Sequence, residues 1–239
     1  MTEPCRIRHG GARLLLDPSG VLLFEACRTL VVTDLHLEKG SAFARRGVML
    51  PPYDSDLTLK GLEEAVRRLR PSRIVSLGDA FHDAKGAASM PSGAEARLRG
   101  LIATVGSWVW VQGNHDPVAP AGFGGETVPK LAIEGVVLRH EPEGGGGHEI
   151  AGHLHPKARA AVRGVPARPC FARGRTTLVL PAFGRLTGGL DVLGPAFAGL
   201  FGGDAAFCAY LLGSERLYPL PRRLLLPERG AMQRGKTRV

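Results

Sequence analysis

TLVVTDLH, residues 29–36, combines the pattern of a buried strand with the pattern of a polar site. Its first half is a short run of leucine and β-branched residues, which is typical of a strand. Its second half places Asp34 and His36 two residues apart, and both side chains are of types that bind metal ions. The stretch therefore predicts a strand that leads directly into a site.

Five strand-like runs of the chain end in residues of this kind. In open α/β sheets, sites form beyond the carboxyl ends of the strands, so we expect these side chains to face one crevice. Taken singly, each is explained by a capping or turn residue or by a core histidine, but turn chemistry does not explain their joint occurrence. The residues are Asp34 and His36 after VVT, Asp79 after IVSLG, Asn114 after VWVQG, His140 after VVLR, and His153 and His155 in EIAGHLH.

The last of these runs holds two histidines between Gly152 and Pro156. If the segment is extended, side chains two residues apart point to the same side, so His153 and His155 face one point. Such a pair alone is a weak sign of a metal site. Its occurrence beside the other polar strand ends favours metal binding.

The number and kinds of these side chains indicate two metal ions. Seven ligands are too many for one tetrahedral ion and suit two ions bridged by a carboxylate. Two ions about 3.5–4 Å apart hold the attacking and leaving oxygens of a displacement at phosphorus and generate hydroxide near neutral pH. Imidazole, carboxylate and amide ligands without thiolate favour Mn²⁺, with Fe or Zn²⁺ as alternatives, over Ca²⁺. We expect two divalent ions, with Mn²⁺ as the first candidate.

The order of the remaining segments predicts an α/β layered domain. Apolar residues at helical spacing, among them Leu57 and Leu62, predict a helix over 54–70, and a second helix is predicted over 92–105. The second half of the chain is richer in short strands, so we expect a second sheet that packs against the first. Further strands are predicted at residues 12–17, 20–25, 176–183 and 205–212.

The formal net charge of +9 is concentrated near the C-terminus. Residues 215–239 carry seven Lys or Arg and two Glu, which gives this segment +5. A basic tail favours polyanions such as nucleic acid, although a solvated terminus has the same composition. We expect one domain over residues 1–221 and a basic, flexible tail over residues 222–239.

Composition also bears on the compartment. No apolar run approaches the roughly 18 residues of a membrane helix, and the first residues lack the apolar segment of a signal peptide. The four cysteines lie far apart without a CxxC pair, which favours free thiols in a reducing compartment over a zinc ribbon. We expect a cytoplasmic protein without a membrane partner.

The ordered motifs resemble those of the calcineurin-like metallophosphoesterases. The stretches DLHLEKGSAFARRG, LPPYD, LRHEP and LPAFGRLTGG are similar to a narrower bacterial branch, the PdeM-type phosphoesterases called ligase-associated DNA damage response endonucleases. The resemblance implies a metallophosphoesterase-type layered sandwich, in which two mixed β-sheets are flanked by helices and a dinuclear metal site lies at the strand C-terminal ends. The motifs are DLH (34–36), GDAFHD (78–83), GNHD (113–116), RH (139–140) and GHLH (152–155).

The resemblance also implies how the ligands divide. Asp79 would bridge the two ions. His115 would contact the phosphoryl oxygen and protonate the leaving group as a general acid. Each ion would have three further ligands: Asp34, His36 and His155 for the first, and Asn114, His140 and His153 for the second.

One position departs from the family pattern. The second Asp of Gly-Asp-x-x-Asp, which supports the catalytic histidine in the family, is replaced by His82, and Asp83 follows it. We expect Asp83 or Asp116 to orient His115 in its place. Lys39, which follows the first motif, is either a phosphate contact or a solvated charge at the rim of the site.

Other polar and aromatic residues have structural interpretations. His9, in a polar turn, and His148, beside a run of glycines, are expected at the surface. Trp108 and Trp110 alternate in a strand and are expected in the core rather than as platforms for stacked bases.

Three functions remain open from the sequence. The favoured one is a dinuclear metal-dependent phosphodiesterase that acts on DNA in repair, with ligase-associated repair proteins as partners. The alternative is a phosphoesterase for small nucleotides or other phosphate esters. A non-catalytic scaffold is least favoured, because a degenerate site would have lost ligands and all seven are present together with His115.

Overall fold

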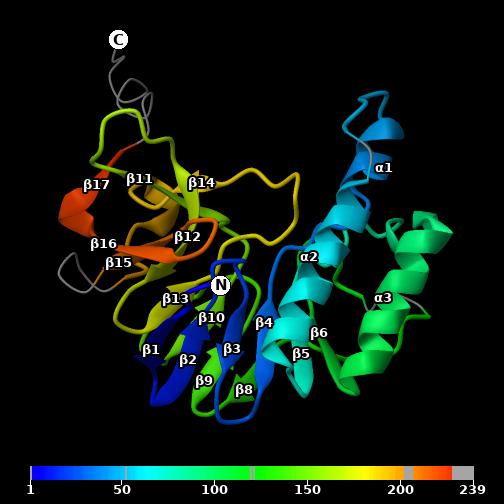
Figure 1. The fold of residues 1–239 in the computed structure, drawn as a ribbon, viewed down its shortest axis with the longest axis horizontal. Coiled ribbons are helices and arrows are strands. Elements are labelled where there is room, and N and C mark those ends of the chain that lie inside the picture. Colours follow the sequence, from blue (N-terminus) through cyan, green and yellow to red (C-terminus); the bar gives the residue numbers. More distant parts are fainter. Residues whose placement is uncertain (1, 52, 119, 121, 202–206, 228–239) are drawn as a thin grey trace.

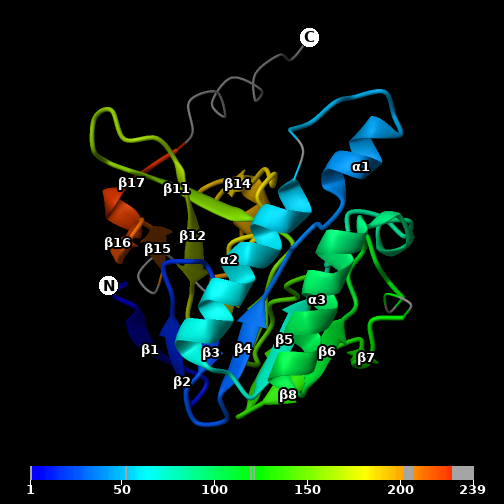
Figure 2. The same cartoon turned by 45° about the vertical axis from the view of Figure 1, so that its right-hand side comes forward.

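The computed structural model describes residues 2–51, 53–118, 120, 122–201 and 207–227 (Figure 1). Two β-sheets pack face to face, and two helices cover the outer face of the first sheet (Figure 2). The α/β layered fold with two mixed sheets is therefore confirmed. Among the described residues, no helix combines the length and the apolar character that crossing a bilayer requires.

The first sheet consists, in spatial order, of β1 (Cys5–His9), β2 (Ala12–Leu16), β3 (Leu22–Phe24), β4 (Thr29–Val32), β5 (Arg73–Leu77), β6 (Trp108–Val111) and β7 (Glu126–Val128). It is antiparallel from β1 to β4 and parallel from β4 to β7. The parallel part brings the C-terminal ends of β4, β5 and β6 to one edge. Residues that directly follow these strands therefore meet there.

Helices α2 (Asp54–Leu69) and α3 (Ser92–Val105) cover one face of this sheet. Both ranges agree with the predicted helices. Leu59 and Leu98 are fully buried in the layer between helices and sheet, because apolar residues at helical spacing fall on one face. Leu57, expected on that face, is 45% exposed instead. A short helix, α1 (Lys39–Ala44), projects beyond the sheet edge (Figure 1).

The second sheet consists, in spatial order, of β14 (Leu190–Asp191), β11 (Pro156–Ala160), β12 (Arg168–Arg173), β13 (Thr177–Val179), β10 (Glu149–Ala151), β9 (Val136–Leu138) and β8 (Leu131–Ile133). Strands β9, β10 and β13 are parallel to one another. Their C-terminal ends also share one edge. Three further strands extend the sheet: β15 (Cys208–Leu212) beside β12, β16 (Leu217–Pro221) beside β15, and β17 (Leu225–Leu226) beside β11.

The core between the sheets fixes how they face each other. Phe24 and Val75 of the first sheet and Ile150 and Phe171 of the second belong to one buried cluster, and all four are fully buried. On the far side of the second sheet, Phe201 belongs to another apolar cluster, which loop residues complete in place of a long helix. The sheets are thus held in one relative position, with the C-terminal ends of β4, β5, β9 and β10 side by side.

The sequence pattern did not predict strand β1, and this strand places His9 elsewhere than expected. This residue is 2% exposed, and its ring Nε2 lies 3.0 Å from the backbone oxygen of Glu149. Its ring also contacts the edge of the half-buried His148 ring. The expected surface position of His9 is wrong because β1 carries it to the interface of the two sheets. Trp108 and Trp110 are each 3% exposed, as predicted.

The first residues of the predicted tail, from Arg222 onward, form described elements of the fold. Residues Arg222–Leu224 form a 3-10 helix, and strand β17 pairs with β11. The apolar side chains of RRLLL account for this, since Leu225 is buried in the outer cluster. The remainder of the predicted tail, residues 228–239, lies outside the described residues.

Candidate metal centre

All seven predicted ligands lie at one edge of the sandwich, in loops that leave the C-terminal ends of strands from both sheets. The first sheet supplies four and the second sheet supplies three. These are Asp34 and His36 after β4, Asp79 after β5, Asn114 after β6, His140 after β9, and His153 and His155 after β10.

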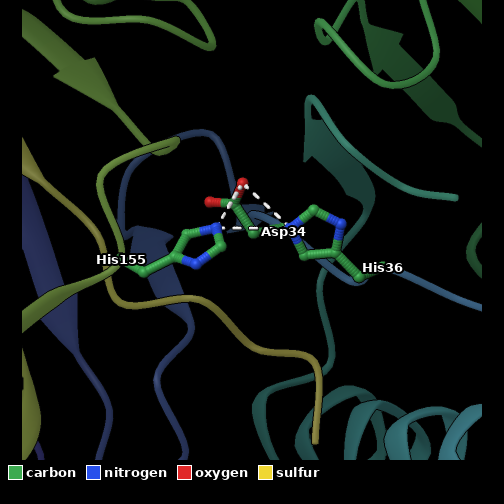
Figure 3. A group of neighbouring side chains, drawn as sticks. All are labelled: Asp34, His36 and His155. Atoms are coloured by element: carbon green, nitrogen blue, oxygen red, sulfur yellow. Dashed lines mark hydrogen bonds and ion pairs between the residues drawn. The ribbon is translucent and has the colours of Figure 1, made fainter. Parts of the chain in front are cut away.

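The first group comprises Asp34, His36 and His155, whose side chains point toward one another (Figure 3). The Nε2 atoms of the two histidines are 3.3 Å apart. Asp34 Oδ1 lies 3.1 Å from His155 Nε2 and 3.9 Å from His36 Nε2. Three potential ligand atoms, brought together by loops of different sheets, thus surround one point.

The second group comprises Asp79, His140 and His153. His140 Nε2 lies 3.3 Å from Asp79 Oδ2 and 3.3 Å from His153 Nδ1. The side-chain oxygen of Asn114 lies 3.0 Å from the same His140 nitrogen. The four side chains therefore bring together a second set of nitrogen and oxygen atoms that could hold an ion.

Asp79 lies between the two groups. Its Oδ2 is 3.3 Å from His140 Nε2 in the second group and 3.9 Å from His36 Nε2 in the first. Its Oδ1 accepts a hydrogen bond of 2.9 Å from the backbone N–H of His115, which fixes the carboxylate. The second oxygen thus faces both groups, where the resemblance leads us to expect a bridging ligand.

The polar contacts of Asp34 fit a bound cation. Its Oδ2 accepts hydrogen bonds from the Thr33 hydroxyl (2.7 Å) and the His153 backbone N–H (3.0 Å). Its Oδ1 is buried and accepts no hydrogen bond from any described residue. A buried carboxylate oxygen that accepts no hydrogen bond is unfavourable by several kcal/mol, and a coordinated cation compensates for this. The imidazole, carboxylate and amide ligands suit Mn²⁺, Fe or Zn²⁺.

The backbone at these ligands is strained. Asp34, His36, Asp79, His153 and His155 all have positive φ, between 44° and 65°. Residues other than glycine rarely adopt this conformation, which costs about 1–3 kcal/mol each and is concentrated at functional sites. The sharp turns allow each chain segment to leave its strand and still direct a side chain to the shared edge.

Two motif glycines are required by contacts between these loops. A Cβ atom at Gly152 would lie 2.0 Å from the Thr33 hydroxyl and 2.6 Å from Asp34 Oδ2. Gly78 has a φ of +75°, and a Cβ atom there would lie 2.2 Å from His140 Nδ1. A side chain at either position would push a ligand out of place.

The ionisation of the site also suits metal binding. Burial lowers the pKa of His36 to about 4, so its imidazole is neutral at pH 7. Burial alone would raise the pKa of Asp79, but the hydrogen bond with His140 and the charge of that ring lower it to about 2. Burial alone would lower the pKa of His140, but Asp79 and Asp34 raise it to about 9. His140 therefore holds a proton at pH 7 that a bound cation must displace.

His115 lies beside the two groups and reaches solvent. Its Nε2 is 4.0 Å from Asp79 Oδ2, and its side chain is 41% exposed. Its Nδ1 lies 2.9 Å from the backbone oxygen of His82, and the two rings are stacked. A carbonyl oxygen only accepts hydrogen bonds, so Nδ1 carries a proton and Nε2 is the ring nitrogen left for other partners.

The residues expected to orient His115 do not contact its ring nitrogen. Asp83 pairs with Arg45 at 2.6 Å. Asp116 Oδ2 accepts a hydrogen bond from the Phe81 backbone N–H, and burial raises the pKa of Asp116 to about 6. The expectation that either carboxylate replaces the missing family Asp is therefore wrong, because the backbone oxygen at position 82 takes that role.

Lys39 lies at the rim. Its ammonium donates a hydrogen bond of 2.8 Å to the backbone oxygen of Leu186, and burial lowers its pKa. The contact joins α1 to the loop after β13. Lys39 is thus neither a fully solvated charge nor in contact with the ligand cluster.

The region that holds these side chains, residues 27–159, matches the family model described as calcineurin-like phosphoesterase. The chain belongs to the calcineurin-like phosphoesterase family. This family hydrolyses phosphoesters with divalent metals, and both groups of potential ligands lie in the matched region. The chain is accordingly a phosphoester hydrolase.

Two solved structures resemble this phosphoesterase. Pseudomonas putida nuclease MPE is 27% identical with a TM-score of 0.71, and the similarity covers 91% of this chain and 100% of that chain. It is consistent with the narrower resemblance noted in the sequence. Yfce, a phosphoesterase from E. coli, is 14% identical with a TM-score of 0.41 over 81% of this chain and 98% of that chain, which is too weak to add support. No curated protein matches.

We predict that Gly152→Ala lowers metal occupancy, because the new methyl group displaces the Asp34 carboxylate or the Thr33 hydroxyl. Gly100→Ala is the matched control, since that glycine lies in α3 with open space around it and alanine favours helices. Metal content by mass spectrometry and the melting temperature report the outcome. Equal occupancy in both variants would show that this close approach does not position the ligands.

We predict that Mn²⁺ binding at pH 7 releases about one proton, because His140 must become neutral to act as a ligand. Apparent affinity should then rise about tenfold per pH unit from pH 7 and level off above pH 9. Isothermal calorimetry in buffers of different ionisation enthalpy measures the proton count. An affinity that does not change over this range would contradict the assigned protonation.

Proposed function

We propose that this phosphoesterase is a dinuclear metal-dependent phosphodiesterase that cleaves the backbone of nucleic acid. The position of Asp79 Oδ2, which faces both ligand groups, is the observation that carries the proposal. A single ion would leave one of the two groups without a partner. Two ions with a bridging carboxylate use all seven side chains, with Mn²⁺ as the first candidate metal.

Different residues have different roles in the proposed hydrolysis. When bound, the ions supply charge that stabilises the phosphoryl oxygens and a hydroxide near neutral pH. In both Asp34 and Asp79, hydrogen bonds from the protein fix one carboxylate oxygen, and the other oxygen faces the ligand cluster. His115 Nε2, next to this cluster and open to solvent, gives a proton to the leaving oxygen.

Nucleic acid is the substrate class favoured by three observations. The similarity to Pseudomonas putida nuclease MPE extends over 91% of this chain. The protein has a formal net charge of +9, which suits a polyanion. Asn114 and His115 are exposed, so a substrate can reach this part of the site from solvent. A role in DNA repair with ligase-associated proteins is part of the proposal and rests on the resemblance of the motifs to the narrower nuclease branch. Small phosphate esters remain the alternative substrate.

We predict that His115→Ala retains its metals and loses roughly 10²–10⁴-fold in turnover of a DNA oligonucleotide, the usual contribution of a general acid. Bis(4-nitrophenyl) phosphate has a good leaving group that needs no proton, so its hydrolysis should fall far less. Steady-state rates of the Mn²⁺-loaded protein on both substrates make the comparison. Asp83→Asn is the matched control, because Asp83 contacts Arg45 rather than the His115 ring.

Two outcomes would count against this proposal. Equal losses on the two substrates would mean that His115 binds phosphate rather than protonating the leaving group. A native protein that hydrolyses the aryl ester and mononucleotide esters but leaves DNA intact would favour the alternative of a small-ester phosphoesterase.

A further inference from the structure

A groove on the first sheet is lined mainly by arginine. It has a volume of about 600 Å³ and lies where β1, β2 and the residues around β3 meet. We call it the arginine groove. Its lining residues are Arg6, Ile7, Arg8, Arg13, Glu25 and Arg28.

Strand register places the arginines on one face. Arg8 stands directly opposite Arg13, and Arg6 precedes Arg8 by two residues, so all three side chains point to the same side of the β1–β2 hairpin. The alternate residues Ile7 and Leu14 pack into the core between the sheets. The hairpin therefore has an apolar inner face, and its outer face carries the three arginines beside Leu15, which is buried in the layer between helices and sheet.

The charge of the groove is largely unbalanced within the protein. Glu25, the one acidic residue of the lining, pairs with Arg6 at 2.8 Å. Arg28 donates hydrogen bonds to backbone oxygens at the end of α2. Within the described part of the chain, the guanidinium groups of Arg8 and Arg13 have neither a hydrogen bond nor an ion pair. Like charges directly opposite each other on a hairpin are destabilising, so an external anion would relieve a real repulsion.

The chemistry of the groove points to phosphate. Guanidinium is planar, always charged and matches phosphate oxygens with two parallel hydrogen bonds. Several guanidinium groups spread along an open groove suit a chain of phosphates better than one small anion. A row of charges also protects an edge strand from pairing with other chains, although lysine is the usual residue for that purpose.

The arginine groove lies at the opposite end of the sheet from the ligand cluster. Arg28 directly precedes β4, whereas Asp34 and His36 follow it. Asp34 follows Arg28 by six residue steps of nearly extended chain, which corresponds to roughly 20 Å. A small ester bound at the ligands therefore cannot reach the groove, but a strand of several nucleotides can.

We propose that the arginine groove is a second binding site for the sugar–phosphate backbone of a nucleic-acid strand whose scissile phosphate lies at the ligand cluster. This inference rests on the proposed nuclease function and adds a separate anchoring site to it. The groove raises affinity for long strands and leaves the chemical step unchanged.

Charge reversal tests the arginine groove. A fluorescent, nuclease-resistant phosphorothioate oligothymidylate of about 30 nucleotides, longer than typical single-strand site sizes, is titrated with Mn²⁺-loaded protein at several salt concentrations. Arg8→Glu and Arg13→Glu should each weaken binding about tenfold and make the slope of log affinity against log salt shallower by about 0.7, the value for one phosphate contact on a single strand. Hydrolysis of bis(4-nitrophenyl) phosphate should stay at the native rate.

Arg163→Glu is the matched control. Arg163 is exposed in the loop between β11 and β12, which lies far from β1 and β2 in both Figure 1 and Figure 2. The Arg163→Glu substitution changes the net charge by the same amount as each groove variant. It should leave the slope of log affinity against log salt unaltered. Melting temperatures confirm that all variants are folded.

The outcomes distinguish failure of the groove proposal from failure of the proposed nuclease function. If the native protein binds the oligonucleotide and both groove variants keep its affinity and slope, the groove is an edge-protecting charge cluster and this inference is wrong. An equal loss in Arg163→Glu would show an effect of net charge alone and would also overturn it. If the native protein hydrolyses the aryl ester but does not bind the oligonucleotide, the proposed nucleic-acid substrate fails as well.

Discussion

The Asp79 carboxylate is the contact on which the rest of the site depends. One oxygen is held by the His115 backbone N–H, and the other faces His36 and His140. The same residue thus links the two groups of side chains to each other and to the loop that carries His115. Its position requires β5 to end at the same edge as β4, β9 and β10, so the face-to-face packing of the two sheets sets the geometry of the chemistry.

The fold stabilises a cluster of buried polar groups that is unfavourable in isolation. Five of the predicted ligands adopt left-handed backbone conformations, and Asp34 Oδ1 is buried without a hydrogen bond from the described residues. The shared core of the two sheets outweighs this strain because it buries large side chains such as Phe24 and Phe171 completely. The strain, in turn, is what directs side chains from separate strands to one point, and close approaches such as that of Gly152 to Asp34 keep them there.

The sequence predicted that the seven polar side chains meet, and it predicted both long helices, because these patterns are local. An apolar run followed by Asp or His marks the end of a strand, and strand ends of an α/β sheet converge. The partner of His115 could not be predicted, since it is a backbone oxygen whose position depends on the path of the chain near His82. The burial of His9 and the arginine groove likewise depend on strand β1, whose alternation of arginine with Cys5 and Ile7 acquires meaning only when the hairpin register is known.

Anomalous diffraction at the manganese edge, from crystals grown with Mn²⁺, tests the central claim most directly. The account predicts two peaks about 3.5–4 Å apart with Asp79 Oδ2 between them. One peak should contact Asp34, His36 and His155, and the other should contact Asn114, His140 and His153. A single peak, or two peaks of which neither contacts Asp79, would contradict the dinuclear centre.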